Sequence, residues 1–291
     1  MAVWLITGAS RGLGSAIARA ALAEGHTVVA GARNVPAAAA ELPHSDALTV
    51  IDLDVTNSAQ VSAVADATAK RHGGIDVLVN NAGYSVLGAV EELTDTETRD
   101  MFEVNVFGLH RMTRAVLPHM RARGRGRILN IGSVGGFAAV ASSGLYGATK
   151  FAVEAITEAL ALELRGSGVS ATVIEPGAFR TDFLSPRSVR FAATEIDAYA
   201  DTAGAARTAF AALDGHQPGD PDKAAAAILA VAAADPAPLR VQLGRDCVAR
   251  VERKLLDVCQ ELGRWRAIAE STDFSTSPAE STSGTRTVGA A

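Results

Sequence analysis

The sequence is poor in cysteine, has no long apolar run and carries no excess of positive charge, and each of these absences excludes a class of protein. Its two cysteines, Cys247 and Cys259, form no close pair, which argues against a disulfide framework and a zinc site. The six histidines are dispersed without ligand spacing, so we expect no metal. No apolar run approaches the roughly 20 residues that span a bilayer.

Residues 2–6 are apolar, but no charged segment precedes them and the run stops after a few positions. They predict a buried strand and not a signal peptide. We therefore expect a cytoplasmic protein that contacts no membrane. The net charge of −5 and the scattered basic residues give no nucleic-acid-binding face. The one basic run, from Arg121 to Arg127, lies between an expected helix and an expected strand, where we expect a solvated loop.

Alternating apolar runs and helical segments predict the fold class. With 291 residues, 48% of them hydrophobic, the chain is long enough for one large α/β domain. Short β-rich apolar runs occur at residues 3–7, 27–31, 48–53, 77–80, 128–133, 169–175 and 239–243. Helical periodicity lies between them, for example at residues 15–24, 59–71, 97–121 and 148–165. This alternation predicts a Rossmann-like, doubly wound parallel sheet with helices on both faces.

Two segments depart from the alternation. Residues 183–222 form a long excursion with prolines near its ends, which predicts a lid. Residues 271–291 are rich in Ser, Thr, Gly and Ala and predict a disordered tail. The expected organisation is a single domain over residues 1–270, with the lid inside it and the tail after it.

Apolar residues before the tail recur at spacings of three and four, the pattern of a helix with one apolar stripe. The stripe consists of Val248, Val251, Leu255, Val258, Leu262 and Trp265. Its length of about two and a half heptads is too short to predict a coiled coil. The stripe packs either on the domain near the lid or against another subunit. Packing on the domain is the favoured alternative, and it would make Cys259 a buried apolar filler.

A glycine-rich turn directly follows the first expected strand. Residues 7–14 are Thr-Gly-Ala-Ser-Arg-Gly-Leu-Gly, and a helix is expected after them. Glycine lets the backbone come close to a ligand, and the N–H groups and dipole of a helix N-terminus favour phosphate. The spacing is G-x-x-x-G-x-G, not the G-x-G-x-x-G of the familiar dinucleotide fold. The turn therefore predicts a phosphate site of a particular dinucleotide-binding family.

The end of the second expected strand indicates which dinucleotide is bound. An NAD site places an acid about 20 residues past the glycines, whereas an NADP site places arginine near the extra phosphate. Here Arg33 and Asn34 follow the strand without a carboxylate, and Arg11 in the glycine turn can approach from the other side. Two cations and no acid predict that NADP(H) is preferred over NAD(H).

Tyr146 and Lys150 are four residues apart in an expected helix, so their side chains share one face. A free tyrosine has a pKa of about 10, and a neighbouring cation lowers it. Such a phenol can donate a proton to a ketone oxygen, or take one from an alcohol, while hydride moves at carbon. Ser133 ends an expected strand, where its hydroxyl could hold a substrate oxygen. Asn105 lies inside an expected helix, although asparagine is a poor helix former. Its presence there indicates a polar role, such as holding a water or a carbonyl group.

In order and spacing, these motifs resemble the classical short-chain dehydrogenase/reductase family. The resemblance covers residues 2–182 most strongly and is carried by residues 7–14 and 80–83, Asn105, Ser133, Tyr146 and Lys150. It implies a catalytic tetrad of Asn105, Ser133, Tyr146 and Lys150. Tyr146 would be the acid/base, and Ser133 would orient the carbonyl group. Lys150 would bind the nicotinamide ribose and tune the phenol, and Asn105 would hold a water that relays protons to Lys150.

The resemblance also implies a set of cofactor contacts. Asp54 would lie by the adenine, and Thr181 would lie near the carboxamide or pyrophosphate. The expected cofactor-binding residues are Thr7, Gly8, Ser10, Arg11, Gly12, Leu13, Gly14, Arg33, Asp54, Val55, Asn81, Ala82, Gly83, Asn105, Tyr146, Lys150, Pro176, Gly177 and Thr181. The family further suggests a homo-oligomer, a dimer or tetramer formed through the long helices that contain Asn105 and Tyr146.

The sequence therefore predicts an NADP(H)-dependent oxidoreductase that interconverts a secondary alcohol and a ketone. One alternative is a non-catalytic NADP(H)-binding redox sensor on the same fold, which would not need all four tetrad residues. Another is a nucleotide-sugar epimerase or dehydratase, against which the glycine spacing argues.

The substrate lid, residues 183–222, has few charges near its start, which predicts an apolar or mixed pocket. We expect a small-molecule ketone larger than acetone, such as a lipid-like, aromatic or polyketide-like carbonyl. Ser142 and Ser143, shortly before Tyr146, either face this substrate or are structural. Glu175 is expected to be a strand-end carboxylate in a polar cleft.

Overall fold

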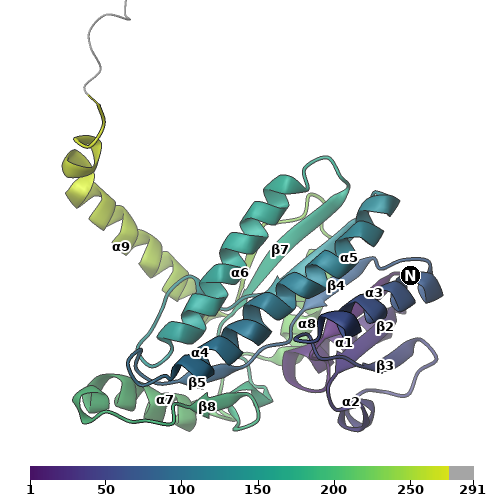
Figure 1. Ribbon diagram of the computed structural model, residues 1–291, viewed down its shortest axis with the longest axis horizontal. Coiled ribbons are helices and arrows are strands. Elements are labelled where there is room, and N and C mark those ends of the chain that lie inside the picture. The colour runs from purple at the N-terminus through teal and green to yellow at the C-terminus, as the bar shows by residue number, and fades with distance from the viewer. Residues whose placement is uncertain (275–291) are drawn as a thin grey trace, which may run out of the picture. The chain divides into compact units, whose positions relative to one another are not determined.

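Short aliphatic and β-branched runs form the strands of a parallel sheet. The structure is a computed structural model, and it describes residues 1–274. Within them the main sheet has seven strands, all parallel, in the order β3-β2-β1-β4-β6-β7-β9. Figure 1 labels β2, β3, β4 and β7 of this sheet. The strands are β1 (Val3–Thr7), β2 (Thr27–Ala32), β3 (Leu48–Asp52), β4 (Val77–Asn80), β6 (Gly126–Ile131), β7 (Val169–Pro176) and β9 (Arg240–Leu243). The predicted Rossmann-like α/β fold is confirmed.

Helices cover both faces of the sheet, because successive residues of a strand point to opposite sides. In β1, Trp4 and Ile6 belong to the apolar cluster on one side, and Leu5 belongs to the cluster on the other. The first cluster includes residues of α1 (Gly12–Ala23) and α8 (Pro221–Ala233). The second includes residues of α3 (Ser58–His72), α5 (Leu109–Arg123) and α6 (Gly144–Glu163). Each face is thus closed by a dry core.

The strand order reverses beside β1, whose neighbours are β2 and β4. In open parallel sheets, ligands bind in the crevice outside the carboxyl ends of the strands at such a point. β1 ends at Thr7 and β4 ends at Asn80. The glycine turn and residues 81–83 therefore flank this crevice.

Two boundaries near the expected site differ from the prediction. β6 ends at Ile131, so Ser133 lies beyond the strand and begins a short 3-10 helix (Val134–Gly136). The sequence predicts one helix over residues 97–121. The structure instead has α4 (Asp95–Phe102), a π-helical turn (Glu103–Gly108) and α5. Asn105 lies in the π-helical turn, a local widening of the helix that often marks functional sites.

The predicted lid, residues 183–222, contains elements that periodicity does not predict. Its strand β8 (Val189–Phe191) pairs in parallel with β5 (Ser85–Leu87), which follows β4. The other short elements are 3-10 helices (Asp182–Leu184 and Asp197–Tyr199), a π-helical turn (Ala200–Gly204), α7 (Ala205–Leu213) and, outside the lid, α2 (Val35–Glu41). A three-residue strand is too short to show a period of two, and its pairing depends on a partner about 100 residues away.

The helix α9 (Arg245–Glu270) begins in one compact unit and continues into another. Residues Met1–Val251 form the first unit, and the described residues from Glu252 onward belong to the second. In α9 only Cys247 and Val251 are buried. Cys259 is exposed, so the expectation that it is a buried apolar filler is wrong.

The tail expected at residues 271–291 lies, from residue 275 onward, outside the described residues. No helix within residues 1–274 is both long and apolar enough to cross a bilayer.

Candidate active site

Glycines shape the turn between β1 and α1. Gly8 and Gly12 have positive φ angles of 65° and 59°, a region that residues with a side chain rarely adopt. A Cβ at Gly14 would lie 2.5 Å from both the Asn81 Nδ2 and the Gly8 carbonyl oxygen. Arg11, the residue before α1, gives the helix no side-chain cap. The first N–H groups of α1 therefore stay available to an anion, and the turn fits a pyrophosphate.

Asn81 and Thr7 fix this turn to the end of β4. Asn81 Nδ2 donates to the carbonyl oxygens of Thr7 and Gly8, both at 3.0 Å. Thr7 Oγ1 accepts from the backbone N–H groups of Asn81 and Ala82, also at 3.0 Å. These residues, all expected to contact the cofactor, thus hold the two strand ends together.

The two arginines expected at the extra phosphate have different surroundings. Arg11 NH2 donates to the Arg187 carbonyl oxygen and to Ser188 Oγ, both at 2.8 Å, so its guanidinium binds the lid. Arg33 is exposed and, among the residues described, takes part in no salt bridge. Burial lowers the pKa of Arg11, and the charge of Arg33 acts in the same direction. The two cations are therefore neighbours, and of the two only Arg33 has no acceptor within residues 1–274.

The turn after β3 contains the expected adenine-side residues. Asp54 Oδ1 accepts from the backbone N–H and the hydroxyl of Thr56, at 2.9 and 2.8 Å. Val55 is buried, and a Cβ at Gly108 would lie 2.5 Å from its Cγ2. Asp54 thus shapes the turn, and Val55 packs against the π-helical turn that holds Asn105.

Tyr146 lies in the first turn of α6 and is hydrogen-bonded to the Ser133 side chain. A Cβ at Gly135 would lie 3.4 Å from Ser133 Oγ and 3.7 Å from Tyr146 Cε1, which shows how closely the two approach. Burial raises the pKa of Tyr146 to about 12, although the hydrogen bond from Ser133 lowers it. The spacing of Tyr146 and Lys150 predicts a pKa lowered by the neighbouring cation. That expectation is wrong here, because burial is the larger effect.

Lys150 lies one turn after Tyr146 on α6, and its side chain is buried. Its Nζ donates to the Ile131 carbonyl oxygen at 2.8 Å and lies 5.9 Å from the centre of the Tyr146 ring. Burial lowers the pKa of Lys150 to about 8, and the charge of Glu154 opposes this change. The charge on Lys150 therefore depends on a carboxylate one turn further along α6.

Asn105 is buried and connects the segment after β4 to α6. Its Nδ2 donates to the Tyr84 carbonyl oxygen at 2.9 Å and to Thr149 Oγ1 at 3.1 Å. Its Oδ1 accepts from the Tyr84 N–H at 3.0 Å. A Cβ at Gly83 would lie 3.0 Å from Asn105 Oδ1 and 3.7 Å from Lys150 Nζ. The structure thus brings Gly83, Asn105 and Lys150 together.

The loop after β7 passes beside the glycine turn. A Cβ at Gly12 would lie 3.5 Å from the Thr181 Cβ. Asp246, at the start of α9, accepts from the Ala178 N–H at 2.7 Å and occupies the space that a Cβ at Gly177 would need. Thr181 and the glycine turn therefore flank the same crevice.

Two carboxyl groups are buried behind Lys150. Glu154 is 7% exposed, and Glu175 on β7 is fully buried. Arg240 Nε donates to Glu154 Oε2 at 3.0 Å and lies 3.8 Å from Glu175 Oε1. Gln242 Nε2 donates to Glu175 Oε2 at 3.1 Å. Glu175 therefore belongs to a buried cluster, and the expectation that it lies in a polar cleft is wrong.

This cluster holds more acid than base. Glu154 Oε1 and Glu175 Oε1 have no hydrogen-bond partner among the residues described. Burial, and then the nearby Glu175, raise the pKa of Glu154 to about 7, although Arg240 lowers it. Glu154 therefore keeps its proton to a much higher pH than an exposed glutamate does.

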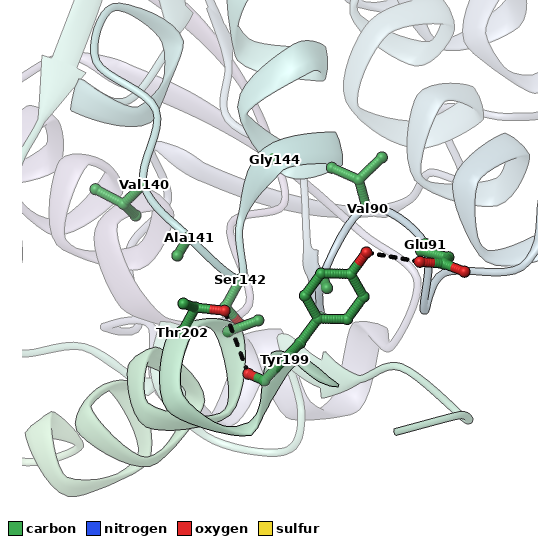
Figure 2. Close-up of a pocket in the computed structure, with 11 residues that line it drawn as sticks. Val90, Glu91, Val140, Ala141, Ser142, Gly144, Tyr199 and Thr202 are labelled. Carbon is green, nitrogen blue, oxygen red and sulfur yellow. Dashed lines mark hydrogen bonds between the residues drawn. The ribbon is translucent and has the colours of Figure 1, made fainter. Parts of the chain in front are cut away.

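A cavity of about 430 Å³ opens beside the start of α6 (Figure 2). Its wall comes from the segment after β5, the loop before α6 and the lid. The lining residues are Gly88, Ala89, Val90, Glu91, Val140, Ala141, Ser142, Gly144, Tyr199, Thr202 and Ala203. The lining is mainly apolar, and the Tyr199 hydroxyl donates to Glu91 Oε2 at 2.6 Å within it. Of the two serines left open by the sequence, Ser142 lines the cavity.

Glu92 joins the lid to the segment after β5. Its carboxylate is buried and accepts from the backbone N–H groups of Ala89 at 2.7 Å and Ile196 at 2.9 Å. Arg207 in α7 lies 3.5 Å from Glu92 Oε2 and 3.2 Å from Glu195 Oε2. The lid forms part of the cavity wall, and the buried charges of Glu92 and Arg207 therefore help to hold this part in place.

Comparison with known proteins identifies the family. Residues 2–190 match the family described as short chain dehydrogenase. The chain belongs to the short-chain dehydrogenase family. Among curated relatives, this short-chain dehydrogenase is 37% identical over 198 residues to a 3-ketodihydrosphingosine reductase of Bacteroides thetaiotaomicron, which covers 68% of this chain and 71% of that protein. It is 42% identical over 182 residues to a 3-alpha-(or 20-beta)-hydroxysteroid dehydrogenase of Mycobacterium tuberculosis, covering 62% of this chain and 69% of that protein.

A solved structure extends the similarity to nearly the whole chain. A short-chain dehydrogenase from Streptomyces avermitilis is 43% identical in sequence and superposes with a TM-score of 0.86. The match covers 94% of this chain and 100% of the other. The fold and the oxidoreductase family of the present short-chain dehydrogenase are therefore established.

Sequence reasoning about this short-chain dehydrogenase missed three charged residues near the site. Glu154 carried a signal, since it lies four residues after Lys150 on the same face of α6. Arg240 and Glu92 had no such signal in the sequence. Arg240 meets Glu154 across 86 residues of chain, and Glu92 meets Ile196 across 104.

Proposed function

We propose that this protein is an NADP(H)-dependent oxidoreductase that interconverts a secondary alcohol and a ketone, with Tyr146 as acid/base. One observation supports this most strongly: residues 81–83 lie against both halves of the site. Asn81 and Ala82 hold the glycine turn, and Gly83 adjoins Asn105 and Lys150. A nucleotide in the turn and a carbonyl group at Tyr146 would therefore be neighbours.

In ketone reduction, Ser133 and Tyr146 would orient the carbonyl oxygen by hydrogen bonds. The chemistry that NADPH would supply when bound is a hydride for the carbonyl carbon. The Tyr146 hydroxyl would give its proton to the carbonyl oxygen, so that C=O would become CH–OH. Since burial raises the pKa of Tyr146 to about 12, the phenol is protonated at neutral pH and ready to donate. The Lys150 cation, 5.9 Å from the ring centre, would stabilise the phenolate that remains.

The residues present fit a dinucleotide with an extra phosphate. The N–H groups of the glycine turn and of the start of α1 would hold the pyrophosphate, and Thr181 would close the site from the other side. At the end of β2, Arg33 has no acidic neighbour in sequence, and Asn34 is used to cap α2 by accepting from the Ala37 N–H at 3.0 Å. Arg33 is thus the residue that would bind the 2′-phosphate. Arg11 would contribute charge while it holds the lid.

We propose a large, neutral, mainly apolar ketone or alcohol as the substrate. The cavity beside α6 has a mainly apolar lining and a volume in the range of small-molecule sites. Outside the lining of this cavity, the Phe183 ring lies 6.0 Å from the Tyr146 ring, centre to centre, and would give a substrate at Tyr146 an aromatic neighbour. The two curated relatives support this choice, because their names denote large, mostly apolar compounds.

Parallel titrations with NADPH and NADH, followed by NADPH oxidation with a panel of ketones, test the proposal. We expect tighter binding of NADPH and turnover of large apolar ketones. Tight binding without turnover of any ketone would favour the redox sensor. If neither nucleotide binds, the assignment of the glycine turn is wrong.

Arg33→Asp tests the cofactor choice separately. It replaces a phosphate partner with a ribose acceptor and a like charge, so the ratio of NADPH to NADH affinity should fall by at least about tenfold, or about 1.4 kcal/mol. The control is Arg165→Asp, an exposed position in the turn after α6 ends at Glu163. An unchanged ratio in Arg33→Asp would show that Arg33 does not select the cofactor.

A further inference from the structure

The second unit contains a helical segment with an unusual surface. Every residue of α9 from position 252 to 270 is exposed. Six of these side chains are large and apolar, with exposed fractions from 44% for Val258 to 61% for Ile268; they are Leu255, Leu256, Val258, Leu262, Trp265 and Ile268. Single exposed apolar residues are normal on a protein surface, but six on one segment mark an interaction site.

We propose that this part of α9 pairs with the same segment of a second copy of the chain, forming a two-stranded coiled coil. Most helical stability in proteins comes from packing of an apolar face, and the large apolar side chains of this segment are exposed. Burying these side chains against a partner would remove their apolar surface from water, which favours association. A partner along the apolar face would supply the packing that the helix lacks.

The spacing of the apolar residues fits a helical partner. Val248, Val251, Leu255, Val258, Leu262 and Trp265 alternate at intervals of three and four and occupy the a and d positions of consecutive heptads. The sequence alone does not establish a coiled coil from so short a run. The structure adds that the helix is continuous from Arg245 to Glu270 and leaves the a and d side chains beyond Val251 exposed.

The charges beside this seam favour a second copy over an unrelated partner. Position g of one heptad is Glu261, and position e of the next is Arg266. In a parallel pair these two residues face each other across the seam, with opposite charges. In an antiparallel pair the g positions face each other, and Lys254 meets Glu261 of the second copy. The helix is thus complementary to itself in either orientation.

Pairing would also stabilise the helix that supports the proposed site. Cys247 and Val251 pack with Val134 and Phe137, directly after Ser133. Asp246 holds the Ala178 N–H. The same helix therefore carries both the seam and the residues that fix two loops of the site.

Sedimentation velocity or light scattering on the full chain tests the proposal. Leu255→Lys combined with Leu262→Lys should halve the molar mass at a given concentration, because both changes place charge in the seam. The control is Leu256→Lys, which is equally exposed on the same helix but lies outside the a and d positions. It should keep the mass unchanged. Far-UV circular dichroism checks that both variants remain folded.

Charge substitutions supply a second test. Glu261→Lys should weaken the assembly, and Arg266→Glu should restore it if the pair is parallel, or Lys254→Glu if it is antiparallel. The proposal is overturned if the double-lysine variant keeps its mass, if the Leu256→Lys control dissociates as well, or if the unmodified chain is monomeric at every concentration. Failure of both charge rescues would also contradict the pairing. None of these readouts depends on catalysis.

Discussion

Two clusters of ionisable side chains lie one helical turn apart on α6, and burial changes the pKa values in both. In the first, burial raises the pKa of Tyr146 to about 12 and lowers that of Lys150 to about 8. In the second, burial and the nearby Glu175 raise the pKa of Glu154 to about 7. In each case burial favours the neutral form, as desolvation does for any charged group.

The clusters differ in what surrounds them. Tyr146 and Ser133 are half-buried and lie near the carboxyl ends of the strands, whereas Glu154 and Glu175 are buried. Arg240, whose side chain is 29% exposed, pairs with these two carboxyl groups. In the proposed mechanism a proton on Tyr146 would pass to the substrate, while the charge of Glu154 would act only on its neighbours. Lys150 belongs to both clusters, since Glu154 raises its pKa. Two residues that lie close together on one helix can therefore have different functions.

Removing the hydroxyl of Tyr146 should have the largest effect. Tyr146→Phe deletes the proton donor, so the rate constant for ketone reduction should fall by about 10²–10⁴, while NADPH affinity stays unchanged. Steady-state kinetics and a binding titration measure the two quantities. The control is Tyr199→Phe, which removes a hydroxyl from the lid wall and should keep the rate within a few-fold. If Tyr146→Phe keeps more than about a tenth of the rate constant of the unmodified protein, Tyr146 is not the acid/base.

Removing the cation of the second cluster should affect stability more than rate. Arg240→Gln leaves two buried carboxyl groups without their counter-charge, so the free energy of unfolding should fall by about 3 kcal/mol. The loss should be larger at pH 8 than at pH 5, because protonation of Glu154 relieves it at low pH. Urea denaturation at both pH values measures it.

A matched control for this prediction lies in α9. Arg253 is 79% exposed and pairs with Asp257 at 3.5 Å, so Arg253→Gln should cost less than about 0.5 kcal/mol. Equal losses in the two variants would show that the buried cluster is no more sensitive than a surface pair.

The stability of the unmodified protein should depend on the proton of Glu154. Its pKa is about 7 in the folded protein and 4.5 by reference, so the folded state binds more protons between these values. Stability from this group is therefore greatest below pH 4.5 and is lost as the pH rises through 7, by up to about 3 kcal/mol. Glu154→Gln should remove this dependence in urea denaturation at pH 5 and pH 7.5. If the free energy of unfolding of Glu154→Gln changes with pH as steeply as that of the unmodified protein, another group is responsible for the pH dependence.

The smallest effect should be on the alkaline side of the pH–rate profile. Glu154→Gln removes the charge that raises the pKa of Lys150, so activity that needs the Lys150 cation should be lost at a lower pH. We expect a displacement of less than about one pH unit, since burial remains the larger influence. Glu158→Gln, an exposed neighbour that also bonds Arg240, should leave the profile in place. An identical profile for Glu154→Gln would separate the two clusters entirely.

Local motifs depend on residues that are neighbours in the sequence. The pKa values of the site residues depend instead on residues that are distant in the sequence. Tyr146 and Lys150 share a helix face because they are four residues apart, and Gly8 and Gly12 adopt positive φ because a tight turn follows β1. Both features can be inferred without knowing the fold. The direction of the Tyr146 pKa could not be inferred, because it depends on burial by residues far along the chain. The same holds for Arg11, whose guanidinium binds Ser188 across 177 residues.

By itself, the sequence determined the α/β class, the parallel sheet, the glycine turn and the spacing of Tyr146 and Lys150, because periodicity and backbone sterics are local properties. Only the tertiary structure decided that Glu154, Glu175 and Arg240 form one buried cluster, that Glu92 holds the lid, and that the α9 stripe is exposed beyond Val251. These features depend on which distant segments meet and on how much water they exclude. Burial and electrostatic interactions are properties of the folded chain, and they set the chemistry of the side chains that local sequence brings to the site.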